Sequence, residues 1–254
     1  MVITEIFPNP TVKQVIFQIT FPNLFYLENK IGDIQQKIMK EFPISRLLLR
    51  NRVVVANVPA EQKIEIPSNP QGENIARKIW QFESKDRTIL SISSNSLDLS
   101  SQFYQTYKLG DDNTKKFKCA IKQAVDAFID VMKLPIIDRI GLRYIDQCPI
   151  IAKNNETLVE WYNSKFPLAI FNIADAEAMT FRTIIKRGRY NLGYIESLEK
   201  NDKGEDVLML DFDGSATNVE NVFNYMDITD ELHDLISAAY VETIRKPVYD
   251  WMKK

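Results

Sequence analysis

Apolar residues in the first half of the chain follow two different periods. In 12–21 both alternating sets contain β-formers, which predicts a strand buried largely on both faces. In 24–42 they recur at spacings of three and four, which predicts an amphipathic helix that ends at Pro43. Three later runs, 77–84, 88–94 and 96–104, alternate as strands of an antiparallel meander. A helical stripe then runs from Phe117 to Met132.

Between these elements lie two less regular stretches. Residues 46–58 contain two short apolar runs that fit a hairpin or a bent strand. Residues 59–73 contain three prolines and one glycine and are typical of a loop.

In the second half, strand and helix patterns follow one another in a similar order. It predicts a strand over 134–146, a short helix over 156–166, a strand–turn–strand unit over 179–198 and a strand over 207–214. A final helix is expected from Asp227 to near the C-terminus, kinked or ended at Pro247.

Together these elements predict an α+β fold. We expect curved antiparallel sheets backed on one side by long amphipathic helices. The two halves, 1–134 and 135–254, show a similar order of elements and are expected to pack as one globular unit. No sequence identity recurs at a fixed period, so an internal duplication is a hypothesis from the pattern alone.

Composition changes this picture little. The chain is 45% hydrophobic and 26% charged with a net charge of −2, as in ordinary globular proteins without a general attraction for nucleic acid or anionic membranes. It has no apolar run of membrane-spanning length and no secretory signal, so we expect a cytoplasmic protein without a membrane partner. Its two cysteines are too few for a disulfide framework, and Cys119 is expected on the buried side of its helix.

The central strand 134–146 carries the first candidate site. Arg139 and Arg143 share one face with only Gly141 between them. They are expected either to pair with carboxylates of neighbouring strands or to form an anion or partner site. We expect Arg143 to be buried and paired, and the environment of Arg139 stays open.

A basic cluster in the second half is the other candidate site. It consists of Arg182, Lys186, Arg187 and Arg189, beside the aromatic residues Phe181 and Tyr190. Such a cluster suits a partner or single-stranded nucleic acid, but it also suits a solvated hairpin tip. Asp211 and Asp213 share one face of a strand and are candidate ligands of a metal site, with no third carboxylate at motif spacing.

No sequence motif indicates catalysis or a cofactor. The chain lacks a P-loop, a G-x-G-x-x-G fingerprint, an H-E-x-x-H zinc motif and a G-x-S-x-G elbow. Its single histidine, His233, has only Asp230 as a local partner, so we expect a structural role for it. The sequence thus favours a protein that is not an enzyme and holds no cofactor.

Several blocks resemble a sporadically distributed family of bacterial and archaeal proteins of about this length. These blocks are 8-PNPTVKQVIFQI-19, 80-WQFESKDRTILSISSNSLDL-99, 139-RIGLRYID-146 and the His233-Asp234 pair with Tyr240. The family has no established activity, and its patchy occurrence implies an accessory role in stress, phage response or defence. The segments 210-LDFDG-214 and 232-LHD-234 are also similar to SecB-type export chaperones. That likeness implies an antiparallel sheet, helices and an apolar groove for extended polypeptide.

These observations favour a protein- or peptide-binding subunit of an accessory system. The aromatic residues Tyr104, Tyr107, Trp161 and Tyr162 are expected at the surface, where aromatics are enriched in interfaces. The alternative is a single-stranded nucleic-acid binder or metal-dependent nuclease that uses 182–189 with Asp211 and Asp213. Oligomerisation stays open.

Overall fold

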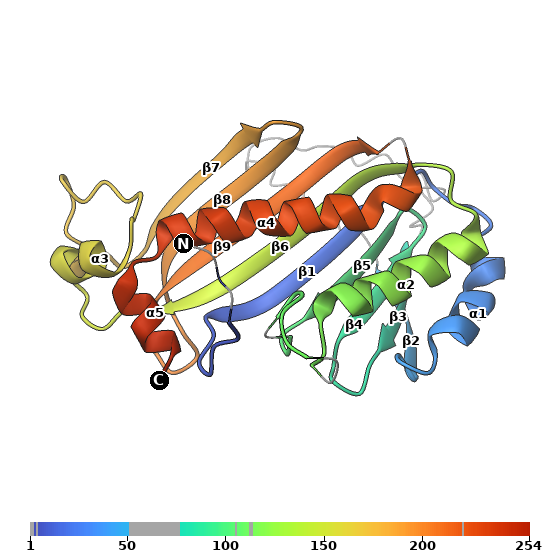
Figure 1. The fold of residues 1–254 in the computed structure, drawn as a ribbon, viewed down its shortest axis with the longest axis horizontal. Coiled ribbons are helices and arrows are strands. Elements are labelled where there is room, and N and C mark those ends of the chain that lie inside the picture. Colours follow the sequence, from blue (N-terminus) through green and yellow to red (C-terminus); the bar gives the residue numbers. More distant parts are fainter. Residues whose placement is uncertain (1–2, 4, 51–76, 105, 112–113, 220) are drawn as a thin grey trace, which may run out of the picture.

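A computed structural model shows one antiparallel sheet of nine strands in the order β2-β3-β4-β5-β1-β6-β9-β8-β7 (Figure 1). The structure describes residues 3, 5–50, 77–104, 106–111, 114–219 and 221–254. The α+β class is confirmed, with a single sheet in place of several. The predicted strand over 46–58 is described only as β2, up to residue 50, and the loop 59–73 lies outside the described residues.

The strands and helices follow the order expected from the hydrophobic pattern. The strands are β1 (Val12–Thr20), β2 (Ile44–Arg50), β3 (Arg77–Glu83), β4 (Ile89–Ser93), β5 (Ser96–Ser101), β6 (Ile137–Pro149), β7 (Met179–Arg187), β8 (Tyr190–Lys200) and β9 (Asp206–Val219). The α-helices are α1 (Leu27–Ile38), α2 (Phe117–Met132), α3 (Asn155–Trp161), α4 (Tyr225–Thr243) and α5 (Lys246–Met252). Short 3-10 turns span Ile173–Asp175 and Val222–Asn224.

The sheet is joined at its centre by the first strand of each half. β1 pairs antiparallel with β6, with Phe17 opposite Leu142 and Ile19 opposite Ile140. On its other side β1 pairs with β5, and β6 pairs with β9. The buried apolar side chains of both halves form one continuous cluster.

Helices cover one face of the sheet (Figure 1). α4 crosses the second-half strands, and α2 and α1 cover the first-half strands on the same side. The strand periodicity explains this arrangement. In β1, Val15, Phe17 and Ile19 are buried, whereas Gln14 and Gln18 on the opposite face are only half-buried. The expectation that β1 is buried on both faces is therefore wrong.

The last helix is divided where proline predicts a break. α4 ends at Thr243, and Pro247 lies in the first turn of α5, where its missing N–H costs no intrahelical hydrogen bond. Cys119 is exposed, so its expected burial in the core is wrong. Among the described residues, no helix is long and apolar enough to cross a membrane.

Candidate functional site

The two arginines of β6 lie on the face of the sheet that the helices leave uncovered. Arg143 Nε donates to Asp211 Oδ1 at 2.7 Å, and Arg139 Nη2 donates to Asp213 Oδ1 at 3.0 Å. The partners lie on β9, the neighbouring strand. The expected pairing of Arg143 is confirmed, and Arg139, whose environment the sequence left open, is paired as well. The expected burial of Arg143 is wrong, because 42% of its side chain is exposed. Each ion pair occupies the arginine that would otherwise bind an external anion.

Replacing Arg143 by leucine should therefore cost about 1–2 kcal/mol of unfolding free energy, less than a fully buried ion pair would cost. The cost arises because Asp211, only 14% exposed, keeps its charge and loses its partner. Arg139→Leu should cost about 0.5 kcal/mol, since Asp213 is 45% exposed and water can solvate it. Urea titrations of both variants measure the difference, and equal costs would contradict this account.

The same ion pairs occupy the two candidate metal ligands, Asp211 and Asp213. Asp211 and Asp213 share the uncovered face as expected, but each carboxylate is bound to an arginine. Among the residues that the structure describes, no three or more His, Cys, Asp or Glu side chains gather in a way that could hold a metal ion.

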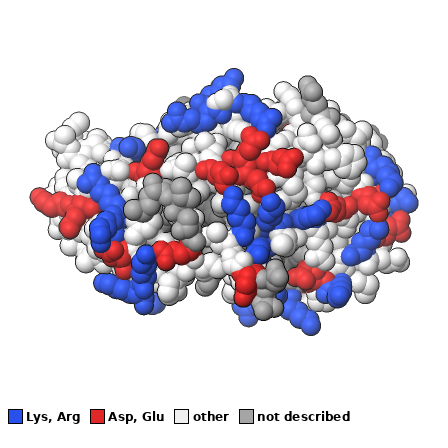
Figure 2. Space-filling model, viewed as in Figure 1, with Lys and Arg blue, Asp and Glu red and all other residues white. Residues whose placement is uncertain are grey.

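The basic cluster lies on a hairpin at the edge of the sheet. β7 and β8 are joined by a two-residue turn, Gly188-Arg189, between the paired residues Arg187 and Tyr190. Gly188 has a φ of 59°, which suits the first position of such a turn because glycine has no Cβ to clash. Figure 2 shows basic side chains gathered over the tip of this hairpin, next to acidic side chains.

The four basic residues do not have the same environment. Arg189 Nη2 donates to Glu231 Oε1 of α4 at 2.8 Å, and its guanidinium lies 5.0 Å from the ring centre of Tyr190. Arg182, Lys186 and Arg187 are exposed and form no ion pair with any described residue. The structure therefore brings together three cations that are available to an external anion.

The aromatic neighbours of this cluster lie on the helix side of the sheet. Tyr190 is 8% exposed and donates its hydroxyl to Glu231 at 2.6 Å. Phe181 packs against the core on the helix side. Its ring lies 6.3 Å from that of Tyr194. Tyr190 is buried and Phe181 is half-buried, so these rings offer little surface on which a base could stack.

The edge position of β7 is the feature that sequence reasoning missed. β7 pairs with β8 on one side, and no described residue pairs with its outer side. Ile184, at the middle of β7, is 65% exposed. An apolar residue between Arg182 and Lys186 is the signal in the sequence, but periodicity alone does not tell an edge strand from a central one.

Other expected surface residues are buried. Tyr107 and Tyr162 are 4% and 1% exposed, so two of the four aromatics expected at the surface belong to the core, and Tyr104 and Trp161 are half-buried. His233 stacks on Tyr107, and its Nδ1 lies 3.1 Å from Asp234 Oδ1. The predicted partner Asp230 instead accepts from Tyr107 at 2.8 Å.

Comparisons of the chain with protein-family models, with curated proteins and with solved structures found no match.

Proposed function

We propose that this protein binds polypeptide, by adding an extended segment of a partner to the outer edge of β7. The observation that supports this most strongly is a nine-residue edge strand whose outer side has no partner among the described residues. Strand addition of this kind derives affinity from main-chain hydrogen bonds and specificity from alternate side chains.

The backbone of β7 is suitably oriented. Arg187 and Tyr190 flank the turn and form the hydrogen-bonded pair that closes the hairpin. Because bonded and non-bonded pairs alternate along an antiparallel ladder, the N–H and C=O groups of Arg182, Ile184 and Lys186 point away from β8. No described strand pairs with these groups, so they can bond to an added strand.

The side chains of β7 define the sequence that a partner needs. On the uncovered face of the sheet, Arg182 and Lys186 flank Ile184 and favour acidic partner residues. On the helix side, Phe181 and Ile185 are half-buried against the core, so apolar partner residues would extend it. The preferred segment therefore alternates acidic and apolar residues.

The same charges disfavour pairing of two copies of this edge. Two β7 strands side by side would bring like charges together, a known defence of edge strands against aggregation. An acidic segment reverses this repulsion into attraction. β2 is the other outer strand, but its last residue, Arg50, is followed by residues outside the described part of the chain.

A nine-residue peptide in which valine alternates with glutamate tests the proposal. The wild-type protein should bind it, and a peptide with lysine in place of glutamate should not bind. The double change Arg182→Glu and Lys186→Glu should weaken binding more than about tenfold. Fluorescence anisotropy at several salt concentrations measures these affinities.

A matched control is the double change Lys40→Glu and Lys85→Glu, which alters the net charge by the same amount as the change in β7. Both lysines are exposed in the first half of the chain and form no ion pair with described residues. It should leave binding unchanged. Equal losses in both double variants would reject a local site. Binding of single-stranded DNA in place of the peptide, lost in the Arg182→Glu/Lys186→Glu variant, would favour the nucleic-acid function instead.

An internal duplication is part of the same proposal. Its support is that the last strand of each half pairs with the first, β5 with β1 and β9 with β6, and that a long helix follows the last strand of each half, α2 after β5 and α4 after β9. The cytoplasmic location and the accessory role in stress or defence stay predictions from the sequence.

A further inference from the structure

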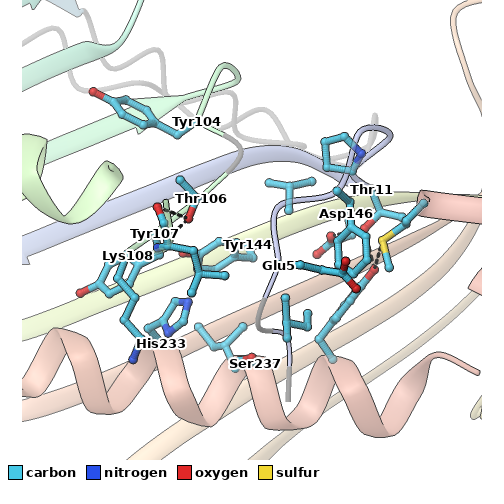
Figure 3. A pocket seen from close by; sticks show the side chains of 18 residues that line it. Glu5, Thr11, Tyr104, Thr106, Tyr107, Lys108, Tyr144, Asp146, His233 and Ser237 are labelled. Atoms are coloured by element: carbon cyan, nitrogen blue, oxygen red, sulfur yellow. Dashed lines mark hydrogen bonds between the residues drawn. The ribbon is translucent and has the colours of Figure 1, made fainter. Parts of the chain in front are cut away.

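A cavity of about 140 Å³ lies on the helix side of the sheet, beside α4 (Figure 3). Residues from near the N-terminus, from the segment that follows β5, from β6 and from α4 and α5 line it. Most of its wall is aromatic or aliphatic, including Phe7, Tyr107, Tyr144, Ile236, Tyr240 and Met252. Such a wall around a few polar groups is typical of small-molecule sites.

The cavity is lined by one buried carboxylate, that of Asp146. Asp146 is 3% exposed and accepts a hydrogen bond from Thr11 Oγ1 at 2.7 Å through Oδ1. Thr11 Oγ1 in turn lies 2.6 Å from the hydroxyl of Tyr240. No described residue donates to the other carboxylate oxygen, Oδ2, so it is available to a group in the cavity.

The positive groups around the cavity are committed elsewhere. Lys108 lies 2.8 Å from Asp234, and Lys253 lies 2.6 Å from Glu5. His233, at the end of the cavity opposite Asp146 (Figure 3), has a pKa lowered by burial and so stays uncharged near neutral pH. No described cation pairs with Asp146. A buried carboxylate without a counter-ion is costly, and a cationic ligand would remove that cost.

A second polar atom of the wall is also unsatisfied. The hydroxyl of Tyr144 is buried and has no hydrogen-bond partner among the described residues. Tyr144 and Asp146 lie two residues apart on the same face of β6, so both side chains face the cavity. Buried hydroxyls without a partner are uncommon, which favours a polar ligand group here.

From these observations we infer that the cavity is a binding site for a small primary amine with an apolar body. The ammonium group would donate to Asp146 Oδ2, and the body would contact the faces of Tyr107 and Tyr144. The volume is close to that of cavities that hold one benzene ring, so the body should have about six to eight non-hydrogen atoms.

Three probes of nearly equal shape test this inference: benzylamine, benzyl alcohol and benzoate. The wild-type protein should bind benzylamine at least about tenfold more tightly than benzyl alcohol, because the charged pair is lost in the alcohol. At pH 8, above the raised pKa of Asp146, it should not bind benzoate, whose charge would repel the Asp146 carboxylate. Isothermal titration calorimetry measures the three affinities.

Two variants connect the binding to the cavity. Asp146→Asn keeps the side-chain size and the acceptor for Thr11, and it should remove the preference for amine over alcohol. Ser237→Leu adds volume at the cavity wall without touching Asp146 and should weaken both ligands. Exposed Asp250→Asn, on α5, is the matched control and should change neither.

Equal binding of amine and alcohol to the wild type would overturn the inference, as would an unchanged preference in Asp146→Asn. Failure of all three probes to bind the wild type would overturn it as well. None of these results depends on β7, which is separated from β6 by β9 and β8 in the sheet.

Discussion

Replacing Ile184 by proline should abolish binding of the alternating peptide while the fold stays intact. The N–H of Ile184 points to the outer side of β7, so proline removes a donor that β8 does not use, and its ring blocks an added strand. Binding should weaken at least about thirtyfold, equivalent to about 2 kcal/mol. Because the charges of β7 are unchanged, the loss would identify the backbone as a contact.

Ile185 provides the matched control for this prediction. Its N–H points toward β8, opposite Leu192, so Ile185→Pro should break the hairpin ladder and cost about 3 kcal/mol of stability. Ile184→Pro should cost about 1 kcal/mol by comparison. Thermal melts and peptide titrations of both variants separate the two effects. Retained peptide binding in Ile184→Pro would show that the peptide is not added as a strand.

Asp146 should make the protein less stable as the pH rises from about 4 to about 7. Burial raises the pKa of Asp146 to about 7, opposed by the hydrogen bond from Thr11. In this window the folded state keeps a proton that the unfolded chain has released, so the free energy of unfolding decreases with pH and levels off above the folded pKa. The total loss is on the order of 4 kcal/mol.

The comparison with Asp146→Asn isolates this contribution. Asparagine does not titrate and still accepts from Thr11, so all other groups should contribute equally to both proteins. Relative to the variant, the wild type should be most stable near pH 4 and lose that advantage by pH 8. Urea titrations across this range measure the difference, and a constant difference would show that Asp146 is not buried as described.

Much of the fold follows from local pattern. The alternation in 179–198 around Gly188 predicted the β7–β8 hairpin, and Pro247 predicted the break between α4 and α5. The order of strands in the sheet could not be predicted from local pattern. β1 pairs with β5 and β6, and these pairings depend on contacts between residues far apart in the sequence. The sequence therefore indicated the elements and not their neighbours.

The candidate sites were likewise predicted only as far as local pattern reaches. Alternation placed Arg143 and Arg139 on one face, but only the position of the helices shows that this face is uncovered. Tyr107 and Tyr162 lie next to helix ends or in irregular segments, where no period indicates burial. The cavity beside α4 is assembled from separate segments, and Asp146 is distinguished only by its burial there.

Residue-resolved hydrogen exchange of β7 is the most direct test of the proposed function. In the free protein, the amides of Arg182, Ile184 and Lys186 should exchange rapidly, while Thr183 and Ile185, which bond to β8, should be protected. With saturating alternating peptide, the three outer amides should slow by about a hundredfold or more as they donate to the added strand. A bound peptide that leaves these three amides in rapid exchange would contradict binding along the edge of β7.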